Sequence, residues 1–96
     1  MYYEVQAKEV CCDVRVSDII WIHTRRSVYE FFVIDPVKAY GVVKGGVLGA
    51  VAKEGFLCLP LPLAVGRRAE LLIESSKGAR YVTTSPITNV RHFRSE

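Results

Sequence analysis

The chain has 96 residues, half of them apolar, which suits one small folded domain and excludes a disordered chain. Its formal net charge of +3 permits an acidic partner, but dedicated nucleic-acid binders usually concentrate more charge. The three cysteines include an adjacent pair and no CxxC pair, which is untypical of a secreted disulfide scaffold. The sequence shows no signal peptide and no apolar run long enough to span a bilayer, so we expect a cytoplasmic protein with no membrane partner.

Alternating hydrophobicity predicts the first strands. Residues 10–16 alternate between two faces as a half-buried strand does, and residues 2–7 form an earlier strand or an extension of it. Two runs rich in β-branched and aromatic residues, 19–24 and 28–34, are separated by three polar residues and predict a hairpin. The proline at position 36 ends this hairpin, because proline cannot donate a hydrogen bond to a neighbouring strand.

The middle of the chain predicts shorter extended segments joined by turns. Residues 40–43 form a short strand, and Gly45 and Gly46 mark a turn or a close backbone approach. Residues 49–55 contain good helix formers, but a segment of this length makes at most a turn or two of helix. Residues 56–59 resume extended structure, and the prolines that follow confine this part to a sheet edge or a connection.

The last third of the chain predicts a closing hairpin of two strands. Ala69, Leu71 and Ile73 alternate with polar residues, so one face of the first strand is expected to be buried. Residues 75–78 supply a tight turn. Residues 81–85 form the return strand, which the next proline is expected to stop.

Together these segments predict one all-β domain that spans residues 1–96. We expect a small barrel or sandwich of about six short antiparallel strands, SH3-like in type. An α+β fold with a short helix at residues 49–55 is the alternative.

The sequence contains no recognisable motif for metal, cofactor or catalytic chemistry. The cysteines and the two histidines lack the short fixed spacings of zinc ligands, and Cys12 is expected to pack in the core. The glycines of residues 41–49 fit neither a Walker loop nor a dinucleotide loop, and no nucleophile elbow is present. We therefore predict no metal, no cofactor and no catalytic residues. A small enzyme ranks third among the functions, and would need a pocket in which His23 or His92 meets a hydroxyl or a carboxylate.

Arginines occur in three clusters with aromatic residues nearby, which is a pattern that single-stranded nucleic-acid binders use. Under this alternative function the contact residues would be Arg25, Arg26, Arg67, Arg68, Arg91 and Arg94. Acidic residues are spread along the whole chain and weaken the positive field. Solvated arginines at strand ends are therefore the favoured interpretation, and nucleic-acid binding is the alternative.

The apolar segment 55–65 is the best candidate for self-association. Its leucines and phenylalanine exceed what one alternating strand would bury, and its prolines prevent pairing in the centre of a sheet. The residues that would pack against another subunit are Phe56, Leu57, Leu59, Leu61 and Leu63. A connection that crosses the core of the monomer is the equally weighted alternative.

Three short motifs together resemble a pattern in small uncharacterised bacterial proteins: residues 24–31, the pair Gly45 and Gly46, and residues 83–87. The resemblance implies a compact β fold and carries no activity. Buried hydroxyls in the last motif would need partners, so Thr84 or Ser85 is expected to tie the closing strand to a neighbouring backbone.

The polar groups and flexible backbone of these motifs define a candidate ligand site on loops over a rigid scaffold. Its residues are Arg25, Arg26, Ser27, Tyr29, Gly45, Gly46, Thr84 and Ser85. The function that we predict is a non-catalytic binding or assembly module that forms a homo-oligomer.

Overall fold

Ten strands and one 3-10 turn make up the part of the chain that this computed structural model describes, residues 1–6, 9–11, 13–57 and 62–96. The strands are β1 (Tyr2–Val5), β2 (Glu9–Val10), β3 (Ile19–Thr24), β4 (Val28–Asp35), β5 (Tyr40–Gly45), β6 (Lys53–Leu57), β7 (Leu63–Ala64), β8 (Glu70–Ser75), β9 (Gly78–Thr83) and β10 (Ile87–Ser95). The turn η1 is Gly46–Leu48. The predicted all-β class is confirmed, with ten strands rather than about six. No helix in the described residues is long and apolar enough to cross a membrane.

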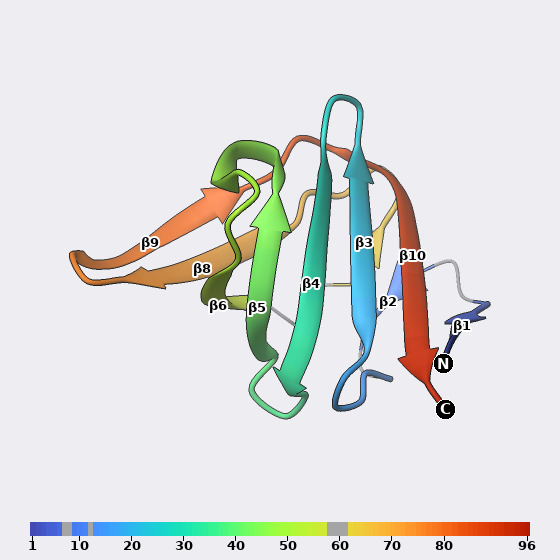
Figure 1. Cartoon of the computed structure of the whole chain (residues 1–96). Coiled ribbons are helices and arrows are strands. Elements are labelled where there is room, and N and C mark those ends of the chain that lie inside the picture. Colours follow the sequence, from blue (N-terminus) through green and yellow to red (C-terminus); the bar gives the residue numbers. More distant parts are fainter. Residues whose placement is uncertain (7–8, 12, 58–61) are drawn as a thin grey trace.

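Eight strands form one antiparallel sheet in the order β1-β10-β3-β4-β5-β6-β8-β9 (Figure 1). This sheet curls back on itself where the chain between β9 and β10 pairs with the residues that precede β8. The Ile87 amide donates to the carbonyl oxygen of Arg67 at 2.7 Å, and the Thr84 amide donates to that of Ala69 at 2.9 Å. The outer part of the β8–β9 hairpin extends away from the body of the protein (Figure 1).

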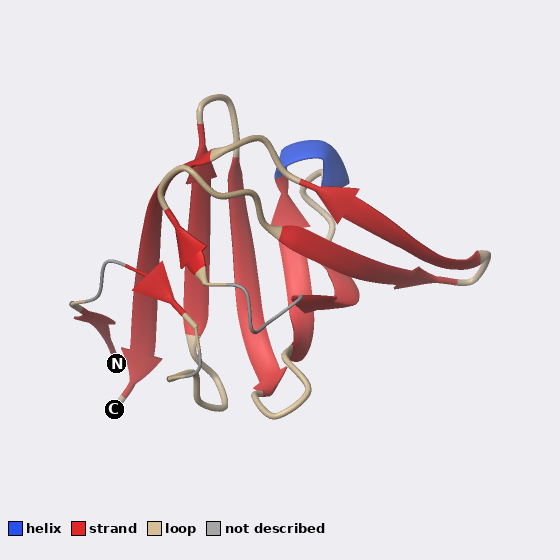
Figure 2. Cartoon of the chain, turned by 180° about the vertical axis from the view of Figure 1, so that it is seen from behind, coloured by secondary structure: helices blue, strands red, loops and turns tan. Residues whose placement is uncertain are grey.

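A second, two-stranded sheet of β2 and β7 lies behind the main sheet and close to β10 (Figure 2). Val10 pairs with Leu63 in this small sheet, and both side chains are buried. The short pair therefore covers one side of the hydrophobic core that the curled sheet leaves open.

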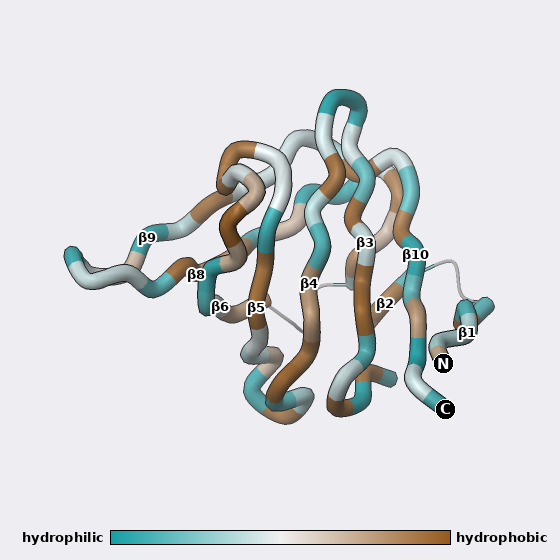
Figure 3. Tube along the Cα trace, viewed as in Figure 1, coloured by the Kyte–Doolittle hydropathy of each residue, from teal (hydrophilic) through white to brown (hydrophobic). Residues whose placement is uncertain are grey.

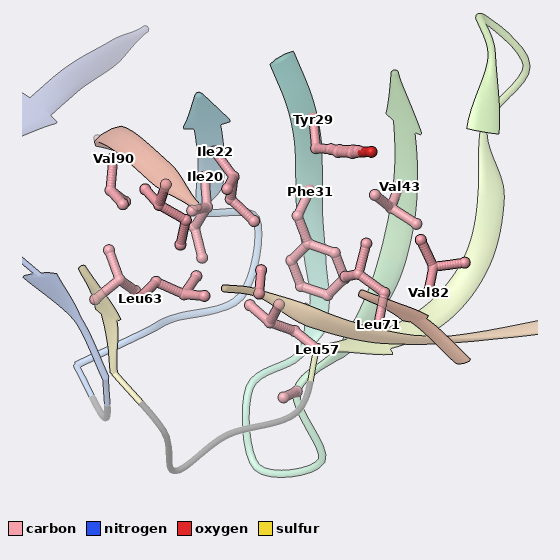
Figure 4. Close-up of a cluster of buried hydrophobic side chains, with 14 of the residues drawn as sticks. Ile20, Ile22, Tyr29, Phe31, Val43, Leu57, Leu63, Leu71, Val82 and Val90 are labelled. Atoms are coloured by element: carbon pink, nitrogen blue, oxygen red, sulfur yellow. The ribbon is translucent and has the colours of Figure 1, made fainter. Parts of the chain in front are cut away.

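The core consists mainly of the inward-facing residues of the strands other than β1 (Figure 4). Alternation along β3 and β4 buries Ile20, Ile22, Phe31 and Val33, while their sequence neighbours face outward. The strand β8 contributes Leu71 and Ile73, and Ala69, which directly precedes the strand, completes the predicted buried face. The β3–β4 hairpin was predicted correctly, and so was the buried face of β8.

The predicted closing hairpin is present as β8 and β9, with its turn at residues 75–78, but a third strand that was not predicted follows it. The chain continues after Pro86 into β10, which has nine residues and lies between β1 and β3. The inward positions of β10 include His92 and Arg94, whose polarity hides the strand pattern in the sequence. Pro86 precedes the strand, where no donor to a neighbouring strand is needed.

Two other predicted segments also differ. Within residues 10–16, only Val10 belongs to a strand, and the described residues 13–16 carry no strand, while Cys12 lies outside the described residues. Val16 is 61% exposed rather than buried. Residues 49–55 form no helix, because η1 precedes them and β6 begins at Lys53.

Candidate functional site

The outer face of the main sheet is unusually apolar at β4. Alternation along this strand turns Val28, Phe32 and Ile34 outward, with 46%, 36% and 43% of their surfaces exposed. Figure 3 shows that hydrophobic residues occupy much of β3, β4 and β5, so these strands are apolar on both faces. A half-buried antiparallel sheet normally turns polar side chains toward water.

Strand register joins the outward residues of four strands into one row. Phe93 of β10 pairs with Ile19 of β3, Ile19 with Phe32 of β4, and Phe32 with Val42 of β5. Directly opposed residues on one face of a sheet have contacting side chains. The row therefore forms a continuous apolar band across the four strands.

A second row carries charges and is built around Arg91. Its guanidinium donates two hydrogen bonds to the Glu4 carboxylate, at 3.0 and 2.8 Å. The same group lies 5.4 Å from the ring centroid of Trp21 and 5.0 Å from that of Phe93. The hydrogen bond from Arg91 lowers the pKa of Glu4 below its ordinary value. Arg91 is thus held against the outer face by a carboxylate and two rings.

The charged row continues on the other side of Trp21. The indole Nε1 donates to Glu30 at 3.0 Å, and Glu30 lies 3.8 Å from the Lys44 ammonium. Trp21 opposes Glu30, and Glu30 opposes Lys44, on adjacent strands. The outer face therefore combines an apolar band with paired charges of both signs.

Two hollows open on this face beside the loop that follows η1. The first has a volume of about 420 Å³ and is lined by Trp21, His23, Val28, Glu30, Lys44, Gly45 and Ala50. The second, of about 370 Å³, is lined by Glu30, Phe32, Val42, Lys44 and Ala52. Among the described residues, His23 Nε2 is the one buried side-chain polar atom with no hydrogen-bond partner. Such an atom is costly unless an occupant of the hollow supplies a partner.

A third hollow lies at the tip of the β3–β4 hairpin, at a different end of the molecule from β1 (Figure 1). Its volume is about 430 Å³, and it is lined by Arg25, Arg26, Ser85, Pro86 and Thr88. Two of the predicted motifs thus meet here, because the β3–β4 tip and the chain around Ser85 are adjacent in space.

Arg67 and Arg68 flank the same segment from its other side. Ile87 pairs with Thr24 of β3 and also donates its amide to Arg67, so it lies between the two arginine pairs. The Arg68 guanidinium donates to the carbonyl oxygen of Thr84 at 3.1 Å. Two of the three arginine clusters therefore converge, although they are far apart in the sequence.

The third arginine cluster has internal partners. Arg91 is bound to Glu4, and Arg94 is 8% exposed and donates to Asp18 at 3.1 Å. The nucleic-acid hypothesis requires arginine side chains that are open to phosphate groups, whereas these two are already bound to carboxylates.

Asp18, His92 and Arg94 form a buried polar network that the sequence did not suggest. His92 Nε2 lies 2.6 Å from the Asp18 carboxylate, and the Arg15 amide donates to the same group at 3.0 Å. Burial alone would raise the pKa of Asp18, but the hydrogen bonds from Arg94, His92 and the Arg15 amide outweigh it and lower that pKa. His92 does meet a carboxylate, but the pair is enclosed and already bound to Arg94, which indicates a structural role. The described residues hold no group of three or more potential metal ligands.

The residues Tyr29, Gly45 and Gly46 serve the fold rather than an open site. Tyr29 is 3% exposed, and its hydroxyl accepts a hydrogen bond from the Val47 amide at 3.4 Å. Gly46 has a φ of +52° and lies so close to the Tyr29 ring that a Cβ there would collide with it. Gly45 also lines the first hollow.

Thr84 and the serines differ in their surroundings. Thr84 is buried, accepts a hydrogen bond from the Ala69 amide at 3.0 Å and donates to the Ser85 carbonyl oxygen at 2.8 Å. The predicted tie between the closing strand and a neighbouring backbone is thus confirmed for Thr84. Ser85 is exposed at the third hollow. Ser27 lies in the β3–β4 turn, where its carbonyl oxygen accepts a hydrogen bond from the Thr24 amide.

Two of the three described residues of the predicted self-association set are buried. Leu57 and Leu63 are each 3% exposed and belong to the core, as the alternative of a core-crossing connection expects. Phe56 is half-buried, and its ring centroid lies 5.0 Å from that of Tyr40. Leu59 and Leu61 lie outside the described residues.

Two surfaces thus remain as candidates for binding: the apolar outer face of the sheet and the basic hollow at the β3–β4 tip. Three residues of the basic hollow, Arg25, Arg26 and Ser85, were predicted to share one candidate site, whereas the apolar face depends on the order of strands in the sheet and was not predicted. Comparisons of the chain with protein-family models, with curated proteins and with solved structures found no match.

Proposed function

We propose that this protein is a non-catalytic assembly module that pairs with a second copy of itself through the outer face of β10, β3, β4 and β5. We call this surface the apolar face, and its residues are Ile19, Trp21, Val28, Phe32, Ile34, Val42 and Phe93. The observation that carries the proposal is the run of three exposed apolar side chains on β4, Val28, Phe32 and Ile34. Exposed apolar patches of more than a few hundred Å² mark interaction sites in soluble proteins.

The size of the apolar face suits a protein partner. Four strands spaced ~4.8 Å apart, with about six residues each at ~3.3 Å per residue, give a projected face of roughly 400 Å². Side chains that stand above this plane add further area and bring the face toward the ~800 Å² that each partner buries in an interface of standard size. An apolar centre beside a charged row also matches the anatomy of such interfaces.

The charges on this face favour a second copy over a strongly acidic or basic partner. Arg91 and Lys44 carry positive charge, while Glu4 and Glu30 carry negative charge, so the row is balanced. A two-fold axis brings the same patch together on both subunits, which requires a surface that complements itself. A balanced row meets this requirement. A side chain from the second copy that enters the first hollow could also supply the missing partner of His23 Nε2.

The test is the oligomeric state of the wild type and of two matched variants, measured by sedimentation velocity across a concentration series. Phe32→Glu places a charge in the centre of the apolar face, whereas Tyr81→Glu places the same charge on the exposed β9 strand. We expect a dimer for the wild type and for Tyr81→Glu, and a monomer for Phe32→Glu with an unchanged circular dichroism spectrum. A wild type that stays monomeric at about 1 mM, a range in which even weak association is detected, contradicts the proposal. So does a Phe32→Glu variant that still forms the dimer.

A further inference from the structure

The hollow at the β3–β4 tip has a chemistry of its own, separate from the apolar face. We propose that it binds the phosphate group of a small phosphorylated molecule. Arg25 and Arg26 line the hollow, and Arg67 and Arg68 bond to residues 87 and 84 of the chain that forms its other wall. We call these four arginines the basic end. The proposal rests on the convergence of two arginine pairs on one short segment of chain.

The fold brings the basic end together through strand pairing. Arg25 and Arg26 line the hollow from the β3–β4 tip, and Ser85, Pro86 and Thr88 line it from the chain that leads into β10. The same chain is also bonded to the segment that precedes β8. The carbonyl oxygen of Arg67 accepts a hydrogen bond from the Ile87 amide, and the Arg68 guanidinium donates one to the Thr84 carbonyl oxygen. The segment 84–88 therefore contacts both of the chain segments that carry the arginine pairs, and the Arg68 guanidinium is bonded to it directly.

These arginines have no internal counter-charge. In the described part of the chain, the ion pairs of arginine with a carboxylate involve Arg91 and Arg94. The formal net charge of the whole chain is +3, and the basic end carries four positive charges. Like charges that are gathered at one end repel one another, and a bound anion relieves that repulsion.

The residue types at the hollow match a phosphate group. A guanidinium presents planar pairs of donors that bind two phosphate oxygens at once, which a lysine ammonium cannot do. Arg68 is anchored at Thr84 through one nitrogen, and the Thr88 hydroxyl is held by the His23 carbonyl oxygen at 3.3 Å. Anchored side chains lose less freedom when a ligand binds.

The size of the hollow and its lining favour a small molecule over a nucleic-acid strand. A volume of about 430 Å³ lies in the range of small-molecule sites. Single-strand binding depends on aromatic rings that stack with bases. The rings near the arginines in sequence lie elsewhere, because Trp21 contacts Arg91 on the outer face and Tyr29 is buried.

The test is a calorimetric titration of the full chain with inorganic pyrophosphate, which measures the dissociation constant. The double variant Arg25→Gln/Arg26→Gln removes two positive charges from the hollow. Its matched control is Lys77→Gln/Arg80→Gln, which removes two positive charges from the exposed β8–β9 hairpin. We expect the dissociation constant to rise about tenfold or more in the first variant and to change less than about twofold in the control, because charge-assisted bonds to phosphate are local.

A second double variant, Arg67→Gln/Arg68→Gln, tests whether both sides of the segment take part, and we expect it to weaken binding as well. The proposal is overturned if the wild type does not bind pyrophosphate at about 1 mM, a concentration that detects even weak ligands. It is also overturned if the hairpin control loses as much affinity as the arginine variants. A single-stranded oligothymidylate that binds more than about tenfold tighter than pyrophosphate, with a steep salt dependence, would instead identify a nucleic-acid backbone as the ligand.

Discussion

Replacing Asp18 with asparagine should destabilise the protein strongly, although the side chain keeps its shape. Asp18 is fully buried and binds both His92, at 2.6 Å, and Arg94, at 3.1 Å. The variant leaves the Arg94 guanidinium without its buried counter-charge, since the remaining carboxylate, that of Asp13, is exposed. Breaking a buried pair from one side costs about 3–5 kcal/mol. A domain of this size loses roughly 4–8 °C in Tm per kcal/mol, so we expect Tm to fall by at least about 12 °C. Thermal and urea unfolding followed by circular dichroism measure both quantities.

Asp13 provides the control for this substitution. Its carboxylate also approaches Arg94, at 3.5 Å, but its side chain is 76% exposed. Exposed ion pairs contribute about 0–1 kcal/mol, so Asp13→Asn should have little effect. The reasoning fails if the free energy of unfolding of Asp18→Asn is within about 1 kcal/mol of that of the wild type, or if Asp13→Asn lowers it by as much as Asp18→Asn does.

The same network predicts a dependence of stability on pH. The native pKa of Asp18 lies below its ordinary value of 3.8, since hydrogen bonds from Arg94, His92 and the Arg15 amide outweigh the effect of burial. At a pH between the native and the unfolded pKa of Asp18, the unfolded chain binds more protons than the native protein does. The stability that Asp18 contributes is therefore complete above pH 3.8 and is lost as the pH falls through the native pKa. The free energy of unfolding of Asp18→Asn should lack this part of the acid dependence, which urea titrations between neutral and acidic pH would measure.

Two further substitutions test local features of the fold. Gly46→Ala combines a positive φ with a collision against the Tyr29 ring, so it should lower the free energy of unfolding by about 2–4 kcal/mol. Gly49→Ala also has a positive φ but meets open space, so it should lower the free energy of unfolding by about 1 kcal/mol. Equal losses in urea unfolding would remove the steric part of this argument. Thr84→Val keeps the side-chain shape but leaves the Ala69 amide without its acceptor, so it should cost about 1–3 kcal/mol and speed hydrogen exchange at that amide. Unchanged exchange would show that the hydrogen bond is not important.

The sequence predicted the strands whose hydrophobic pattern is local and clear. Alternation marked the buried face of β8, and two dense apolar runs marked the β3–β4 hairpin. The same reasoning missed β10, because Pro86 suggested an end and the inward positions of His92 and Arg94 are polar. Those two polar residues are buried only because Asp18, more than seventy residues away, lies opposite them.

The apolar face could not be predicted for a related reason, whereas Arg25, Arg26 and Ser85 of the basic hollow were already grouped in one candidate site. Residues 28–34 are apolar at nearly every position, so their pattern does not tell which face of the strand meets water. The apolar face becomes visible only when β10, β3, β4 and β5 are placed side by side. Likewise, the segments that carry Arg25 and Arg67 are joined only through Ile87, which pairs with Thr24 on one segment and with Arg67 on the other.

The positions of the two surfaces make the two proposals independent. The apolar face lies along the bodies of the strands, whereas Arg25 and Arg26 lie in the turn beyond the ends of β3 and β4. Pairing of two copies through the strand bodies leaves this turn at the end of each subunit, open to solvent. The balanced charges of the apolar face also do not attract phosphate, whereas the third hollow is lined by two arginines and by no acidic residue. A protein that lacks one activity can therefore keep the other, since each depends on a different set of side chains held by one sheet.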